Sequence, residues 1–129
     1  MNPPGNIELI KGEIADYWLD PVGILHAYSK NPKRTVENIS NNITLVRKIT
    51  GHKKVPLLIY LSNSPVPDKE TRKFSAEQLP NVYTAMAMIS KTGLAKFIMN
   101  ILFSLKTPPI PMKSFSDENE AQEWLKQYL

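Results

Sequence analysis

The stretch LSNSPVPDKETR, residues 61–72, holds the residues best suited to chemistry. It follows the apolar run VPLLIYL (55–61), which predicts a buried strand, and it leads into a predicted helix. Binding sites in α/β proteins commonly form at the carboxyl ends of strands. This 61–72 corner could therefore carry chemistry, a regulatory switch or only a turn. Its candidate residues bear hydroxyl, carboxylate and ammonium groups: Ser62, Ser64, Asp68, Lys69, Glu70 and Thr71.

Catalytic motifs are absent from the rest of the sequence. The chain has no cysteine, which excludes disulfides, thiolate nucleophiles and cysteine-based metal sites. It has no Gly-x-Ser-x-Gly sequence, no glycine-rich phosphate loop and no HExxH sequence. We therefore expect no enzyme, with no catalytic residue, no metal and no cofactor.

The two histidines and one aspartate pair receive ordinary structural interpretations. His26 and His52 are 26 residues apart, so they do not have the short local spacing of a zinc site. We expect His26 to be a half-exposed strand residue and His52 to be a loop residue. Asp16 and Asp20 are predicted to lie on one face of a strand, directed toward solvent.

Composition is that of one soluble globular domain. The 129 residues are 42% hydrophobic and 22% charged, enough for one core, so we expect a single domain over 1–129 with a flexible segment at 1–6. The amino terminus lacks the pattern of a signal peptide. The longest apolar-rich segment, residues 94–105, contains Lys96 and Asn100 and is too short to cross a bilayer. These features predict a cytoplasmic protein without an integral membrane segment.

The net charge of +4 includes one dense basic cluster: Arg47, Lys48, His52, Lys53 and Lys54. A nucleic-acid interface would interleave such residues with exposed aromatic side chains or place them along one helix face. Here they coincide with the predicted end of a helix, where the helix dipole favours cations. We therefore expect no nucleic-acid partner.

Hydrophobic periodicity predicts strands and helices in a clear order. Strands are expected at 7–11, 13–19, 23–29, 55–61, 82–90 and near the end of 107–115, with a break at Gly12 and a turn at 20–23. Helices are expected from Thr35 to Gly51, from Asp68 to Pro80, over 93–105, and from the N-cap Ser116 to the carboxyl terminus. An antiparallel meander followed by alternating helices and strands indicates an α/β fold, with a mixed sheet of about five strands and helices on both faces.

Four stretches carry a resemblance to a known family: GHKKVPLLIYLSN (51–63), DKETRKF (68–74), TAMAMISKTGLAKFIMNILFSL (84–105) and PMKSFSDENEAQEWL (111–125). They resemble the STAS and SpoIIAA-like superfamily, and more closely small stand-alone bacterial members without an assigned role. Together they cover most of residues 51–125, and they resemble the fold rather than a catalytic site. The resemblance implies the SpoIIAA-like fold.

The resemblance also bears on the 61–72 corner. Partner-switching STAS proteins carry an Asp-Ser-Ser-Gly-like motif at this helix start, and a kinase phosphorylates one serine of it. Alignment places Asp68 on the motif's aspartate, Lys69 on the phosphorylated serine, Glu70 on the next serine and Thr71 on the glycine. The phosphorylatable serine is therefore missing, and we expect Thr71 to be a solvated helix residue.

The predicted helix 93–105 has an unusually broad apolar surface. Segment 107–111, a second subunit, a lipid-like ligand or a membrane surface could cover it. We expect intramolecular cover together with dimerisation. The predicted hydrophobic interface consists of Phe97, Met99, Ile101 and Phe103.

These observations predict a non-catalytic protein-interaction or regulatory module of the bacterial cytoplasm. Its partner would be another protein or a second copy of itself, bound through the 61–72 corner and helix 93–105. The alternative is a binding protein for a small hydrophobic ligand or a membrane surface through the same helix. The lipid-transfer CRAL-TRIO proteins, which have a related fold, bind such ligands.

Overall fold

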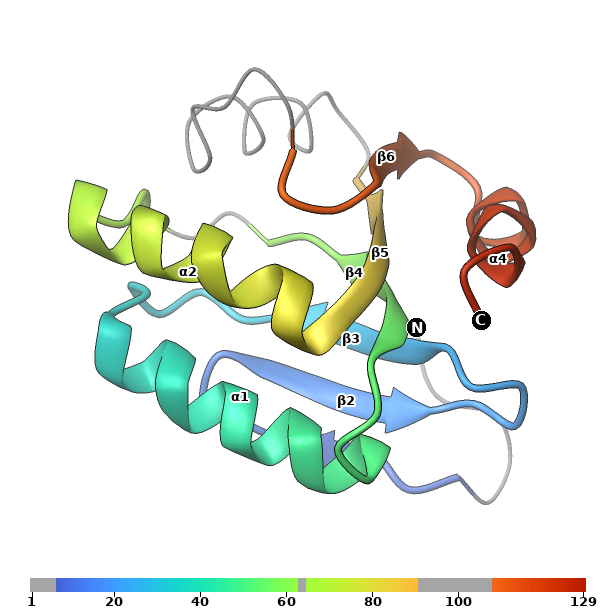
Figure 1. The fold of residues 1–129 in the computed structure, drawn as a ribbon, viewed down its shortest axis with the longest axis horizontal. Helices are drawn as coiled ribbons and strands as arrows, with labels where there is room; N and C mark the ends of the chain where they lie inside the picture. The colour runs from blue at the N-terminus through green and yellow to red at the C-terminus, as the bar shows by residue number, and fades with distance from the viewer. Residues whose placement is uncertain (1–6, 63–64, 91–107) are drawn as a thin grey trace.

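A six-stranded mixed sheet forms the centre of the protein, which we describe from a computed structural model over residues 7–62, 65–90 and 108–129 (Figure 1). The strands lie in the order β1-β2-β3-β4-β5-β6. Their bounds are Ile10–Lys11, Ala15–Leu19, Leu25–Ser29, Val55–Tyr60, Tyr83–Ile89 and Met112–Phe115. The sheet has one strand more than the predicted number of about five, and the strand expected at 7–11 is present only as the two-residue β1.

The sheet changes from antiparallel to parallel at β3. Strand β2 pairs antiparallel with β1 and β3, as the predicted meander requires, whereas β3, β4, β5 and β6 pair in parallel. Parallel neighbours need a crossover connection, and crossovers place helices on the faces of a sheet. The mixed α/β class predicted from the sequence is confirmed.

Three helices in the described residues cover the two faces: α1 (Val36–Thr50), α2 (Lys69–Val82) and α4 (Glu118–Lys126). Helices α1 and α2 lie on one face and α4 lies on the other (Figure 1). Residues of β4 alternate between two cores, so that Leu57 packs on the α1 and α2 side and Leu58 packs on the α4 side. None of the helices described here is long and apolar enough to cross a membrane. The predicted helix 93–105 lies outside the described residues, as does segment 1–6.

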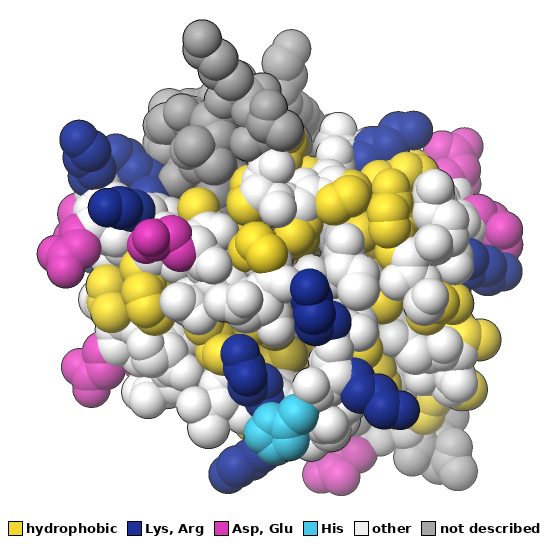
Figure 2. All heavy atoms as spheres, in the orientation of Figure 1, with side chains coloured by type: hydrophobic (Ala, Val, Ile, Leu, Met, Phe, Trp, Pro, Cys, Tyr) yellow, Lys and Arg dark blue, Asp and Glu magenta, His cyan; other side chains and the backbone are white. Residues whose placement is uncertain are grey.

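Three predicted helix ends are confirmed. Thr35 caps α1 in a capping box with Asn38, and Gly51 ends the helix at φ 65°. Asp68 caps α2, and its carboxylate accepts a hydrogen bond from the Thr71 backbone nitrogen at 2.8 Å. Arg47 occupies the last turn of α1, and Figure 2 shows Lys and Arg side chains around a histidine near this end of the molecule.

Three predicted helix ends were wrong, and one of them is the carboxyl end of α4, which lies at Lys126 rather than at the carboxyl terminus. Helix α2 continues past Pro80 to Val82, because a proline in the last turn removes a single N–H donor and the Tyr83 nitrogen still donates to the Leu79 carbonyl. The N-cap of α4 is Asp117 rather than Ser116, and its carboxylate accepts from the Asn119 nitrogen at 3.0 Å. A carboxylate at this position also interacts favourably with the positive end of the helix dipole.

The turn between β2 and β3 is held by a buried pair, contrary to the expected exposure of His26 and Asp20. The His26 side chain is 1% exposed, and its Nε2 lies 2.8 Å from Asp20 Oδ2. Its ring stacks on the Trp18 ring, with the two ring centroids 4.0 Å apart. Asp20 follows the last residue of β2, so its carboxylate can fold back into the turn. There Oδ1 accepts the backbone N–H groups of Val22, Gly23 and Ile24.

We expect Asp20→Asn to lower the free energy of unfolding by about 1–3 kcal/mol at neutral pH, because it removes a charged acceptor from His26. Burial alone raises the pKa of Asp20, but hydrogen bonds from His26 and the backbone outweigh burial and place this pKa below its ordinary value. The stabilisation is therefore present above the unfolded carboxyl pKa of about 3.9, and it is lost as the pH falls through the lower folded pKa. Urea unfolding from pH 7 to pH 3 measures the difference from the unmodified protein.

Asp16→Asn is the matched control for this experiment. Asp16 pairs with Lys30 at 2.8 Å in a more exposed position, so its loss should cost less than about 1 kcal/mol. Equal losses for the two variants, or a loss for Asp20→Asn that does not change with pH, would contradict the assigned role of Asp20.

Candidate functional site: a cavity beneath α1 and α2

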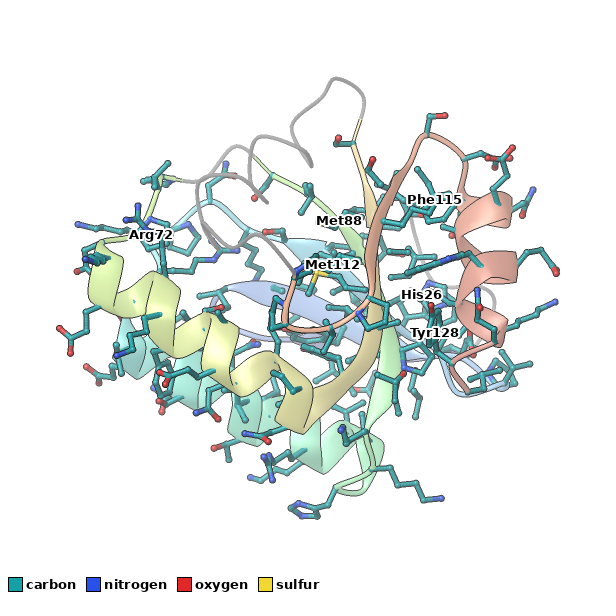
Figure 3. All side chains as sticks on the ribbon, turned by 45° about the horizontal axis from the view of Figure 1, so that its top comes forward. His26, Arg72, Met88, Met112, Phe115 and Tyr128 are labelled. Atoms are coloured by element: carbon teal, nitrogen blue, oxygen red, sulfur yellow. The ribbon has the colours of Figure 1, made fainter. Side chains whose placement is uncertain are left out.

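A cavity of about 180 Å³ lies between helices α1 and α2 and the face of the sheet that they cover. It is partly open, and we call it the α1/α2 cavity. Most of its wall is aliphatic: Ile39, Ile43, Leu57, Leu79, Met86 and Met88. Figure 3 shows Met88 beside β5, and it shows His26 and Tyr128 on the side of α4. An apolar cavity of about 150 Å³ can hold benzene, so this volume suits a small apolar group.

Small side chains leave this space unfilled. Ala15 on β2 and Ser75 on α2 line the cavity, at positions where larger residues would occupy it. Leu57 on β4 and Met88 on β5 also line the cavity, and their side chains pack in the same core as Ala15. A cavity of this size in a packed core costs free energy, because the residues around it lose dispersion contacts.

Hydrogen-bonded polar groups form one part of the wall. The Tyr17 hydroxyl accepts a hydrogen bond from Asn42 Nδ2 at 2.6 Å and is also hydrogen-bonded to Tyr83. Burial raises the pKa of both Tyr17 and Tyr83 above the ordinary value, so both phenols are neutral at physiological pH. Asn42 Oδ1 is buried and has no hydrogen-bond partner among the described residues.

A second polar group in the wall is built around Arg34. Its guanidinium donates to the carbonyl oxygens of Lys30 (2.6 Å), Pro32 (2.7 Å) and Ile14 (3.0 Å) and to Ser29 Oγ (2.7 Å). The hydroxyl of Ser62 lies 3.1 Å from Ser29 Oγ and 2.9 Å from the Lys30 carbonyl oxygen. Ser29 ends β3 and Ser62 follows β4, so this group lies at the carboxyl edge of the parallel strands.

The structure places the predicted residues of the 61–72 corner in different environments. Ser62 lines the α1/α2 cavity, and Asp68, Lys69 and Glu70 are exposed at the start of α2. Hydrogen bonds from the Thr71 backbone and side chain lower the pKa of Asp68. Ser64 lies outside the described residues, and so do the predicted interface residues Phe97, Met99, Ile101 and Phe103.

The prediction that Thr71 is solvated was wrong. Its exposed fraction is 3%, because the residue interacts with the Asp68 cap and lies on the inner side of the first helical turn. Thr71 is therefore a packing residue rather than an accessible hydroxyl.

Sequence reasoning missed the cavity residues on other elements. Arg34 lies between the predicted strand 23–29 and the predicted helix that starts at Thr35, and neither it nor Tyr17, Asn42 and Tyr83 received a functional role. A signal was present, because Asn42 follows Ile39 by three residues and therefore interrupts the apolar stripe of its helix. A polar residue within an apolar stripe indicates a buried hydrogen bond or a ligand contact.

Metal binding has no support in residues 7–62, 65–90 and 108–129, which contain no group of three His, Cys, Asp or Glu side chains able to hold an ion. The polar groups of the cavity can instead hold a small molecule by hydrogen bonds and by the charge of Arg34.

Comparison with solved structures confirms the SpoIIAA-like fold. An uncharacterized protein of the DUF3478 family from Shewanella loihica PV-4, which has this fold, is 18% identical in sequence with a TM-score of 0.55. The match covers 92% of this chain and 91% of that chain. No curated protein matches the sequence. The family model described as a domain of unknown function, DUF7793, matches residues 17–129, and the chain therefore belongs to the DUF7793 family.

Proposed function

We propose that the protein is a non-catalytic binding domain that holds a small, largely apolar ligand in the α1/α2 cavity. The observation that carries this proposal is a cavity of about 180 Å³ with an aliphatic wall and a few polar groups. Binding pockets commonly combine these two features, since the apolar wall supplies affinity and the polar groups orient the ligand. Its polar end, with Ser29 and Ser62, lies at the carboxyl ends of β3 and β4, which adds support.

The chemistry of the wall favours binding over catalysis. A nucleophilic mechanism needs a hydroxyl beside a base, and the described lining contains no His, Asp or Glu. Tyr17 and Tyr83 are neutral, and Arg34 cannot act as a base. The buried His26 and Asp20 pair belongs to the opposite side of the sheet, away from the cavity.

A ligand in this position would act on α2 and thereby give the domain a regulatory role. Ser75, Gln78 and Leu79 of α2 line the cavity, and the same helix starts at the exposed residues Lys69 and Glu70. Occupation of the cavity would therefore favour one placement of α2 over another. We place this role in the bacterial cytoplasm, in agreement with the bacterial origin of the structural neighbour.

The 61–72 corner is a second candidate site, for a protein partner or a second copy of the chain. Val66 is 44% exposed, one of three large hydrophobic side chains that are exposed among the described residues. Lys69 and Glu70 follow it in the sequence, on the exposed start of α2. An exposed apolar side chain beside charges of both signs is a suitable contact for another protein surface.

We expect Ser75→Leu to weaken the binding of toluene and hexan-1-ol by about tenfold or more, because the added methyl groups occupy the cavity. The variant should remain folded, since leucine favours a helix more than serine does. Titration followed by NMR chemical shifts of the cavity methyl groups measures the affinity.

Glu77→Leu is the matched control for the cavity experiment. Glu77 is exposed two residues further along α2 and does not line the cavity, so this variant should bind both probes as the unmodified protein does. If neither probe binds the unmodified protein, or if Ser75→Leu binds both without loss, the cavity is not a binding site.

We expect the double variant Val66→Asp, Lys69→Glu to reduce self-association or partner capture while changing the free energy of unfolding by less than about 0.5 kcal/mol. Both side chains are exposed, so their replacement alters the surface rather than the core. Analytical ultracentrifugation and affinity capture from the native host measure the two effects.

Val22→Asp provides the comparison for the corner variant. Val22 is 58% exposed but lies in the turn between β2 and β3 rather than in the corner. Equal effects of the two surface changes, or no effect of the double variant, would count against the corner as an interface.

A further inference from the structure

Arg34 carries a positive charge without a carboxylate partner in the chain. The ion pairs among the described residues join His26 to Asp20, Lys30 to Asp16 and Lys126 to Glu123, and none includes Arg34. The segments 1–6, 63–64 and 91–107 contain no Asp or Glu, so every acidic side chain of the protein lies in the described part. The chain therefore provides no carboxylate counterion for Arg34.

The environment of Arg34 makes this lack of a partner energetically significant. The Arg34 side chain is only partly exposed. Burial lowers the pKa of its guanidinium, and the electrostatic interaction with Tyr17 acts in the opposite direction. The four carbonyl and hydroxyl contacts supply hydrogen-bond acceptors but no negative charge. A partly desolvated cation is stabilised when an anion binds beside it.

Donors remain for an anionic group at this position. The two terminal nitrogens of Arg34 make all of its hydrogen bonds to described residues, which leaves the Nε–H without an acceptor there. The Ser62 hydroxyl has one hydrogen, which it donates to the Lys30 carbonyl, so Ser29 Oγ accepts from Arg34, donates to Ser62 and can turn its hydrogen to a bound anion instead. The Nε–H, a rotatable hydroxyl and a positive charge thus adjoin the aliphatic wall of the cavity.

We propose that the ligand of the α1/α2 cavity is a small organic acid, with its carboxylate at Arg34 and Ser29 and its apolar body among Leu57, Ile59 and Met88. This inference rests on the proposed binding function and adds the chemical class of the ligand. The volume of about 180 Å³ limits the body to the size of a phenyl ring or a chain of about six carbons.

A phosphate ester fits these features less well than a carboxylate. Phosphate sites in proteins are commonly built from several backbone N–H groups at a helix start or a glycine-rich loop. The cavity wall instead provides one guanidinium, hydroxyl groups and aliphatic side chains. A monocarboxylate needs only one charged donor and a neighbouring hydroxyl, which is what Arg34 and Ser29 supply.

The first test compares hexanoate with hexan-1-ol on the unmodified full-length chain by isothermal titration calorimetry at pH 7. The two probes share an apolar chain and differ in the carboxylate, so we expect hexanoate to bind about tenfold or more tightly. Equal affinities would overturn the acid assignment and leave the binding function intact. Binding of neither probe would overturn the acid assignment and the proposed function together.

Variants of the polar group locate the carboxylate. Arg34→Gln should reduce the affinity for hexanoate to the affinity for hexan-1-ol. Lys33→Gln removes the neighbouring exposed charge and should leave the affinities for both probes unchanged. Because Arg34 also holds carbonyl groups of the 30–34 loop, Ser29→Ala serves as a milder variant that keeps the guanidinium. It should weaken hexanoate binding and leave hexan-1-ol binding unchanged. Unchanged hexanoate affinity in folded Arg34→Gln or in Ser29→Ala would place the carboxylate elsewhere and refute the assignment.

Discussion

The burial of β4 on both faces is the constraint on which the architecture depends. Leu57 and Leu58 are consecutive residues of this strand, and they enter different cores on opposite faces of the sheet. Strand β4 also pairs in parallel with both neighbours, so each neighbour must be reached by a crossover. Helices α1 and α2 are these crossovers, and both cover the same face (Figure 1). The space that becomes the cavity exists because two helices share this face.

The two faces of the sheet are packed by residues of different size. On the α4 side, Ala85 and Ala87 of β5 meet Ala121 of α4, and all three are fully buried. Small residues on both surfaces allow the helix to approach the sheet closely, which leaves little free volume. On the other side, Met86 and Met88 project from the same strand toward α1 and α2. Met86 and Met88 line the cavity together with the small residues Ala15 and Ser75.

Local sequence patterns predicted the elements well but not the site. Periodicity and cap residues such as Thr35 and Gly51 act within a few residues, so they can be recognised in one sequence. The cavity depends instead on contacts between distant positions: Arg34 donates to Ile14 across 20 residues, and Ser62 contacts Ser29 across 33 residues. Periodicity indicates that a residue faces inward but does not identify its partner. The buried His26 was missed for the same reason, because its partners depend on the turn conformation.

The start of α2 connects the two proposed sites. Asp68 is retained at the position that resembles the phosphorylation motif, where it caps the helix, and Thr71 is buried beside it. A modification would have to act on the outer surface of this helix start. A ligand in the cavity would act on the inner surface, through Ser75 and Leu79 one and two turns further along the same helix. Both would therefore change the free energy of the same element, α2.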